Sequence, residues 1–161
     1  LLFAYSLGKA QRVLAGLDSS IGPIYAHSAV HSFLDHYKNA GVVLPDVKKV
    51  DKEKDFTGAM VIAPPAVEDS SWTRKFRQVK RGFASGWMAI RGPRRRKNLD
   101  RGFVLSDHAD WTGLIDLTTG TGAEKVKVTH GNGDALSRFL QEKGVNTSVL
   151  NESSFRGEEL D

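Results

Sequence analysis

Apolar and polar positions alternate along the chain in a way that predicts strands and helices in turn. Short continuous apolar runs, such as residues 59–63 before Pro64 and Pro65, are typical of strands buried on both faces. We expect strands at residues 1–5, 21–26, 59–63, 83–90, 102–105, 125–129 and 145–150.

Apolar residues at helical spacing predict helices between these strands. We expect helices at residues 7–17, 29–40, 70–79, 111–118 and 134–143. Ser6 is the expected N-cap of the first helix, and Gly41 is the expected end of the second. Residues 46–55 form a polar, lysine-rich connector. Strands that alternate with helices predict an α/β fold with a mostly parallel sheet covered by helices.

Composition narrows the class of protein. The chain has 161 residues, of which 40% are hydrophobic and 26% are charged, and this balance excludes disorder throughout. No window resembles a bilayer-spanning segment and no signal peptide is recognisable, so we expect a cytoplasmic protein without a membrane partner. The absence of cysteine excludes disulfides and thiolate metal sites. Any metal must therefore bind nitrogen and oxygen ligands.

The positive charge is concentrated in one segment. The formal net charge is +4, whereas residues 91–101 alone carry +5. The basic residues that we single out there are Arg91, Arg94, Arg95, Arg96 and Lys97. Such a cluster attracts polyanions by releasing their counterions, which makes nucleic acid a candidate partner. A solvated basic loop is the alternative interpretation.

Two histidines follow predicted strands, where ligands gather in parallel sheets. His108 follows residues 102–105, and His130 follows residues 125–129. Asp107 and Asp110 flank His108, so a metal site with nitrogen and oxygen ligands or an acid–base pair is chemically feasible. Turn and capping roles are the alternative for these residues. His27 and His31 have the spacing of a zinc pair, but the glutamate of the zincin helix motif is absent and we interpret them as structural.

Several short strings follow one another in the order seen in a known family. They are Phe3-Ala4-Tyr5-Ser6-Leu7-Gly8-Lys9-Ala10-Gln11, Pro23-Ile24-Tyr25, Val61-Ile62-Ala63-Pro64-Pro65, Ser106-Asp107-His108-Ala109-Asp110-Trp111 and Val128-Thr129-His130-Gly131. The chain resembles the metallo-β-lactamase-fold nucleases with an inserted β-CASP domain. It looks closest to the bacterial ligase-associated DNA exonucleases, which are also labelled mRNA 3'-end processing factors. The resemblance covers nearly the whole chain.

The resemblance implies roles for individual residues. His108 would be the β-CASP histidine beside the scissile phosphate, and His130 would be similar to the last zinc ligand of the metallo-β-lactamase fold. Two zinc ions would share the nucleophilic water. Asp107 and Asp110 would orient His108, and the basic residues of segment 91–101 would approach the nucleic acid backbone. A role in DNA repair or RNA processing, and an association with a DNA ligase system, are implied in the same way.

The family's other zinc motifs are absent from this sequence. One ligand cannot hold a catalytic zinc pair, so we expect the parent protein to be a nuclease and this chain alone to be inactive. We expect a β-CASP segment at residues 1–81, a segment completing the metallo-β-lactamase sheet at residues 82–150, and a flexible tail at residues 151–161. A non-catalytic nucleic-acid-binding module that uses the arginine-rich loop is the second hypothesis. A domain that serves only as a protein-interaction surface is the third.

Overall fold

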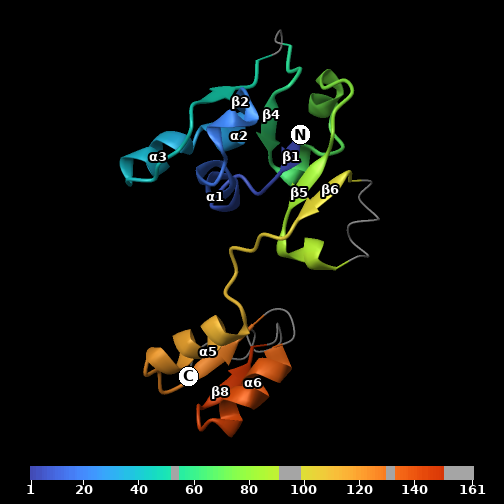
Figure 1. Ribbon diagram of the computed structural model, residues 1–161. Coiled ribbons are helices and arrows are strands. Elements are labelled where there is room, and N and C mark those ends of the chain that lie inside the picture. Colours follow the sequence, from blue (N-terminus) through green and yellow to red (C-terminus); the bar gives the residue numbers. More distant parts are fainter. Residues whose placement is uncertain (52–54, 91–98, 130–132, 151–161) are drawn as a thin grey trace, which may run out of the picture. The chain divides into compact units, whose positions relative to one another are not determined.

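The computed structural model describes residues 1–51, 55–90, 99–129 and 133–150. The chain divides into two compact units, Leu1–Asp107 and His108–Asp161 (Figure 1). Each unit is described below by itself.

The first unit is built on a parallel sheet. Its strands are β1 (Leu2–Phe3), β2 (Ile24–Ala26), β3 (Val47–Lys49), β4 (Met60–Ala63), β5 (Gly82–Ala84) and β6 (Arg101–Phe103). They lie in the order β3-β2-β4-β1-β5-β6, and every neighbouring pair is parallel. In the register of the central strands, Leu2 lies between Ile62 and Gly82. The predicted α/β class with a mostly parallel sheet is confirmed.

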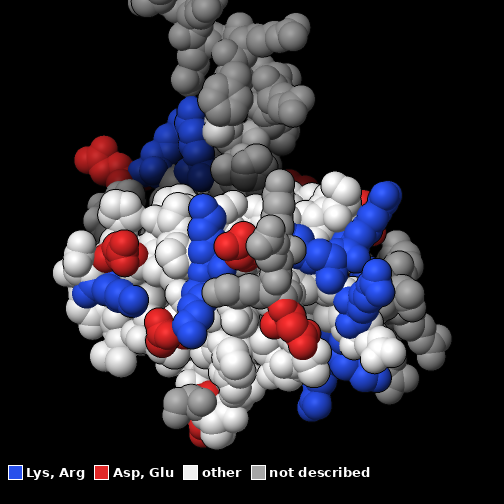
Figure 2. All heavy atoms as spheres, turned by 90° about the horizontal axis from the view of Figure 1, so that it is seen from above, with Lys and Arg blue, Asp and Glu red and all other residues white. Residues whose placement is uncertain are grey.

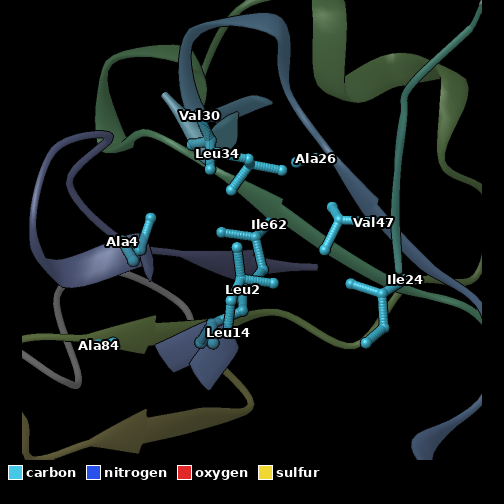
Figure 3. Packing of buried hydrophobic residues seen from close by; sticks show 11 residues of the cluster. Leu2, Ala4, Leu14, Ile24, Ala26, Val30, Leu34, Val47, Ile62 and Ala84 are labelled. Carbon is cyan, nitrogen blue, oxygen red and sulfur yellow. The ribbon is translucent and has the colours of Figure 1, made fainter. Parts of the chain in front are cut away.

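Helices and short turns cover the sheet. The α-helices are α1 (Lys9–Ala15), α2 (Ser28–His31) and α3 (Leu34–Asn39), and the 3-10 helices are η1 (Ser19–Ile21), η2 (Pro65–Val67), η3 (Ser71–Lys75) and η4 (Gly86–Ala89). Leu14, Val30 and Leu34 bring α1, α2 and α3 onto one cluster with the strand residues Leu2 and Ile62 (Figure 3).

The residues that alternate with these along the strands belong to separate clusters. Phe3 and Phe83 pack with Met88 of η4, while Tyr25 and Val61 pack with Phe76. Because neighbouring strand residues point to opposite faces, both faces of the sheet are covered. This arrangement explains why the inner strands β1, β2, β4 and β5 are made of apolar residues instead of alternating with charged ones.

The structure corrects several element predictions in the first unit. The expected helix at residues 29–40 is two helices, because Phe33 donates to the carbonyl of Val30 in a tight turn that separates α2 from α3. The connector at residues 46–55 contains strand β3, which pairs with β2 at the sheet edge. The expected strand at residues 83–90 ends at Ala84, because the hydroxyl of Ser85 caps η4 by accepting from the backbone N–H of Trp87.

The second unit contains a small β-α-β arrangement. Strands β7 (Val126–Val128) and β8 (Thr147–Val149) pair in parallel, α6 (Gly133–Glu142) connects them, and α5 (Trp111–Gly120) precedes them. Leu140 of α6 is fully buried, and the hydroxyls of Ser137 and Thr147 lie 2.8 Å apart in a buried hydrogen bond. The predicted helices and strands of this part are confirmed within two or three residues.

Strands β5 and β6 lie beyond residue 81, where we expect the boundary between the β-CASP segment and the next one. They pair in the same sheet as β1, and the first unit extends to Asp107. The predicted tail at residues 151–161 lies outside the described residues. Within the described part of the chain, every helix is too short or too polar to cross a bilayer.

Candidate functional site at the carboxyl edge of the sheet

The carboxyl ends of the parallel strands meet at one edge of the first unit. The segments that leave this edge include residues 4–8 after β1, Ser85 and Gly86 after β5, and residues 104–107 after β6. In sheets of this kind, ligands bind outside the carboxyl ends of the strands. The segment after β6 carries Ser106 and Asp107 and leads directly to His108.

An ion pair with a buried lysine ties Asp107 to helix α1. The Lys9 Nζ lies 2.8 Å from the Asp107 Oδ1, and the Lys9 side chain is 5% exposed whereas that of Asp107 is 37% exposed. The same Lys9 Nζ lies 4.9 Å above the ring centroid of Tyr5. A lysine this deeply buried requires a partner, because an unpaired ammonium away from water is strongly unfavourable. The position of Asp107 is therefore coupled to the first turn of α1.

A second bond holds the neighbouring residue. The Arg12 guanidinium donates through Nη1 to the Ser106 carbonyl oxygen at 2.8 Å. On the other side, a Cβ added at Gly86 would lie 3.2 Å from the Ser106 Cβ, a close approach that only glycine permits without a shift. Arg12 thus holds the backbone of Ser106, and Lys9 holds the side chain of Asp107.

The loop before α1 is shaped by a buried glutamine. Gln11 is fully buried, and its Nε2 donates to the Ser6 carbonyl oxygen at 2.9 Å. Gly8 adopts a φ of 82°, which favours glycine, and it occupies the N-cap position without a side-chain cap. The prediction that Ser6 caps this helix is wrong, because Ser6 contributes its carbonyl to Gln11 and α1 begins at Lys9.

The other residues of the Ser106–Trp111 string belong to the second unit. The His108 side chain is exposed. The Asp110 Oδ1 accepts the backbone N–H of Gly113 at 2.8 Å and thereby caps α5. Capping satisfies a helix N–H that has no intrahelical partner, so the alternative interpretation, a capping role, holds for Asp110. The orienting role of Asp107 and Asp110 toward His108 stays a prediction.

The other predicted site residues cannot be placed. His130 and the basic residues of the arginine-rich loop (Arg91, Arg94, Arg95, Arg96 and Lys97) lie outside the described residues. Among the side chains that the structure describes, no three His, Asp or Glu residues are grouped so that they would hold a metal ion. These described residues therefore do not make up the zinc site that the family resemblance implies.

His27, at the carboxyl end of β2, has a structural role in the described chain. Its Nδ1 accepts the backbone N–H of Ala29 at 3.1 Å and caps α2, and its ring packs edge-on against Trp72 at 4.7 Å between centroids. Burial lowers the pKa of His27 below its ordinary value, and the nearby Lys75 ammonium lowers it further. The acceptor at Nδ1 requires the neutral imidazole, which agrees with a lowered pKa.

We expect the free energy of unfolding of the first unit to decrease as the pH is lowered, because of this histidine. Because the pKa of folded His27 is lowered, the unfolded chain binds more protons once the pH falls below about 6.5. The contribution of His27 is therefore complete above that pH and is lost as the pH falls toward the lowered pKa. Urea unfolding at about pH 7.5 and about pH 5.5 measures the difference. His27→Asn, which keeps a capping acceptor but does not titrate, should make the difference smaller, and an unchanged difference would contradict the assignment.

Comparisons with known proteins give one distant similarity. No family model and no solved structure matches this chain. A curated protein from Opitutus terrae, named a probable DNA ligase, is 29% identical over 153 residues. The match covers 95% of this chain and 15% of that protein, so the chain spans a small part of the length of its relative.

Sequence reasoning missed the positioning roles of Lys9 and Arg12. Lys9 belongs to one of the strings that carry the family resemblance, but no role follows from its spacing. A lysine between the apolar positions Leu7, Ala10 and Leu14 was the available signal, because a charge near a buried helix face needs a partner. The partner, Asp107, lies almost a hundred residues away in the chain, and only the fold brings it to Lys9.

Proposed function

We propose that this chain is part of a DNA-processing enzyme, and specifically of a metal-dependent nuclease that hydrolyses phosphodiester bonds in DNA or RNA. The observation that carries the proposal is that Arg12 and Lys9 hold Ser106 and Asp107 at the carboxyl edge of a parallel sheet, directly before His108 in the chain. The similarity to a protein named a probable DNA ligase supports a DNA-related role.

In this proposal, His108 acts beside the scissile phosphate and His130 is one ligand of a zinc pair. The described residues do not hold a metal by themselves, so the other ligands must come from outside them. What this chain contributes is the position of its own groups: α1 holds Ser106 and Asp107, the two residues that directly precede His108. Positioning a reacting group in advance removes an entropic cost from the reaction.

The test compares the 161-residue chain with a longer protein that contains it. We expect the longer protein to bind about two zinc ions and to cleave single-stranded DNA or RNA, and to lose cleavage with a chelator or with His130→Ala. The 161-residue chain should neither bind the zinc pair nor cleave. If the short chain binds zinc and cleaves by itself, the assignment of the metal site is wrong.

The second candidate, a non-catalytic nucleic-acid-binding module, predicts a different result. Binding to nucleic acid would then fall with salt but would be unaffected by the chelator and by His130→Ala. Absence of both cleavage and binding in the longer protein would favour the third candidate, a surface for protein interaction.

A further inference from the structure

The connection between β4 and β5 carries a second concentration of positive charge at residues 74–81, which we call the basic segment. Five of the eight residues 74–81 are basic and none is acidic. They are Arg74, Lys75, Arg77, Lys80 and Arg81. Even with Glu68 and Asp69 counted, residues 64–81 carry five positive and two negative charges, or +3. This segment is separate in sequence from the arginine-rich loop.

Aromatic packing anchors the basic segment to the sheet. Phe76 is buried in a cluster with Tyr25 and Val61, and Trp72 and Val79 pack against the same cluster. The Lys75 Nζ lies 4.8 Å above the Trp72 ring. Anchoring matters because a positively charged surface that is already ordered loses less conformational entropy when it binds.

Three of the five basic side chains of the segment are exposed to solvent. Arg74, Arg77 and Lys80 are exposed, whereas Phe76 is buried and Val79 is half-buried. Gln78 adopts a φ of 50°, in the left-handed region, between Arg77 and Val79. This conformation costs about 1 kcal/mol for a residue with a side chain. The backbone thus turns at Gln78, with an exposed cation before it and an anchoring apolar residue after it.

One acidic neighbour of the basic segment is Asp100, which lies next to Lys80 and Arg81. The Asp100 carboxylate accepts the backbone N–H of Arg81 at 2.7 Å, and this bond holds the pKa of Asp100 below its ordinary value. Its contact with the Lys80 Nζ is 3.7 Å long, and both side chains are exposed to water. An exposed pair at that distance contributes little. Figure 2 shows several Lys and Arg side chains gathered along one side of the face drawn there, while Asp and Glu side chains are scattered over it.

We propose that the basic segment binds the phosphate backbone of a nucleic acid strand. Lys and Arg that neutralise phosphates release condensed counterions, which supplies affinity without base specificity. The inference rests on the proposed function for its choice of partner and adds a contact to it. Arg81 leads into the amino end of β5, whereas Ser106 and Asp107 follow the carboxyl end of β6, its parallel neighbour. The segment extends from Lys75, which lies over the Trp72 ring that packs against His27 at the carboxyl end of β2, to the amino end of β5. Its residues are separate from Ser106, Asp107 and His108, so we expect the segment to affect the affinity for nucleic acid and not the chemical step.

The test uses the 161-residue chain and a fluorescently labelled single-stranded DNA. The variant Arg74→Gln/Arg77→Gln/Lys80→Gln removes three exposed cations of the basic segment. The matched control, Lys38→Gln/Lys48→Gln/Lys49→Gln, removes three exposed cations from α3 and β3 of the same unit. Affinity is measured between about 50 mM and about 200 mM salt. We expect the first variant to lower affinity about tenfold or more at low salt and to reduce the salt slope by about two, and the control to change neither.

Each other result overturns the inference. If both triple variants bind alike, net charge alone matters and the basic segment is not a site. If the 161-residue chain binds anionic lipid vesicles but no DNA, the proposed partner is wrong.

Two controls accompany these measurements. Thermal unfolding of both variants checks that they are folded. The variant Arg74→Lys/Arg77→Lys, which keeps the charge, should retain binding. In the longer protein, the triple variant should raise KM with little change in kcat, whereas failure of the proposed function would appear as no cleavage by the unsubstituted protein.

Discussion

Replacing Asp107 by alanine is expected to lower the free energy of unfolding of the first unit by about 2 kcal/mol. The substitution leaves the ammonium of Lys9 buried without the carboxylate that now lies 2.8 Å from it. The effect stays below that of a fully buried pair, because Asp107 is 37% exposed and water can reach the vacated position. Urea unfolding of the 161-residue chain measures the change.

Replacing the other partner of the ion pair, Lys9, should lower the free energy of unfolding by less. Lys9→Met removes the buried charge but keeps a flexible apolar side chain in the same space, and the exposed carboxylate of Asp107 can be hydrated. We expect a loss of about 1 kcal/mol or less, and we expect the double variant to resemble Lys9→Met. Asp46→Ala, at an exposed aspartate of the same unit, is the control and should change stability by less than about 0.5 kcal/mol. Equal losses for Asp107→Ala and Lys9→Met, adding in the double variant, would show that the two side chains are not coupled.

Replacing His108 by glutamine in the longer protein should lower its cleavage rate by about 10²- to 10⁴-fold, with little change in KM. The side chain is exposed, so the stability of the chain should not change. Rates of cleavage of a labelled single strand, measured under saturating and limiting substrate, separate the two constants. The matched control is His36→Gln, at an exposed histidine of α3. Full activity of the His108 variant would remove this residue from the mechanism.

Asp110 provides a companion test, because the structure gives it a capping role. Asp110→Ser keeps a favoured N-cap side chain for the Gly113 N–H and removes the carboxylate. If Asp110 also orients His108, cleavage falls although the helix remains capped. If the carboxylate serves only as a cap, the serine variant keeps its activity, and only Asp110→Ala loses stability, by about 1 kcal/mol.

Substitutions of Lys9 test a different role, that of a residue that positions the segment before His108 without taking part in the reaction. Lys9 and Arg12 bond to Asp107 and Ser106 and so act on His108 only through the backbone. A positioning residue of this kind should lower kcat when it is replaced, and a conservative variant should recover part of it. Lys9→Arg keeps a cation toward Asp107, whereas Lys9→Met does not, so their activities should differ more than their stabilities.

The elements with strong local signals could be predicted from the sequence. The run at residues 59–63 is strand β4, and the amphipathic pattern at residues 134–143 is helix α6. Of the predictions that failed, one depends on a distant partner and another on a local bond. Strand β3 lies in a polar connector and exists because Val47 and the residues after it pair with β2. The strand expected beyond Ala84 stops because Ser85 bonds to the next turn.

The sequence by itself determined the α/β class, the parallel arrangement of the strands and the placement of Ser106, Asp107 and His108 after a strand, because these follow from local periodicity and strand order. Tertiary structure alone decided that Lys9 and Arg12 hold this segment. A buried charge needs a partner in space, and that partner can lie anywhere in the sequence. The partner of Lys9 is Asp107, in the segment that follows β6. No local sequence pattern around Lys9 indicates a residue that lies so far along the chain.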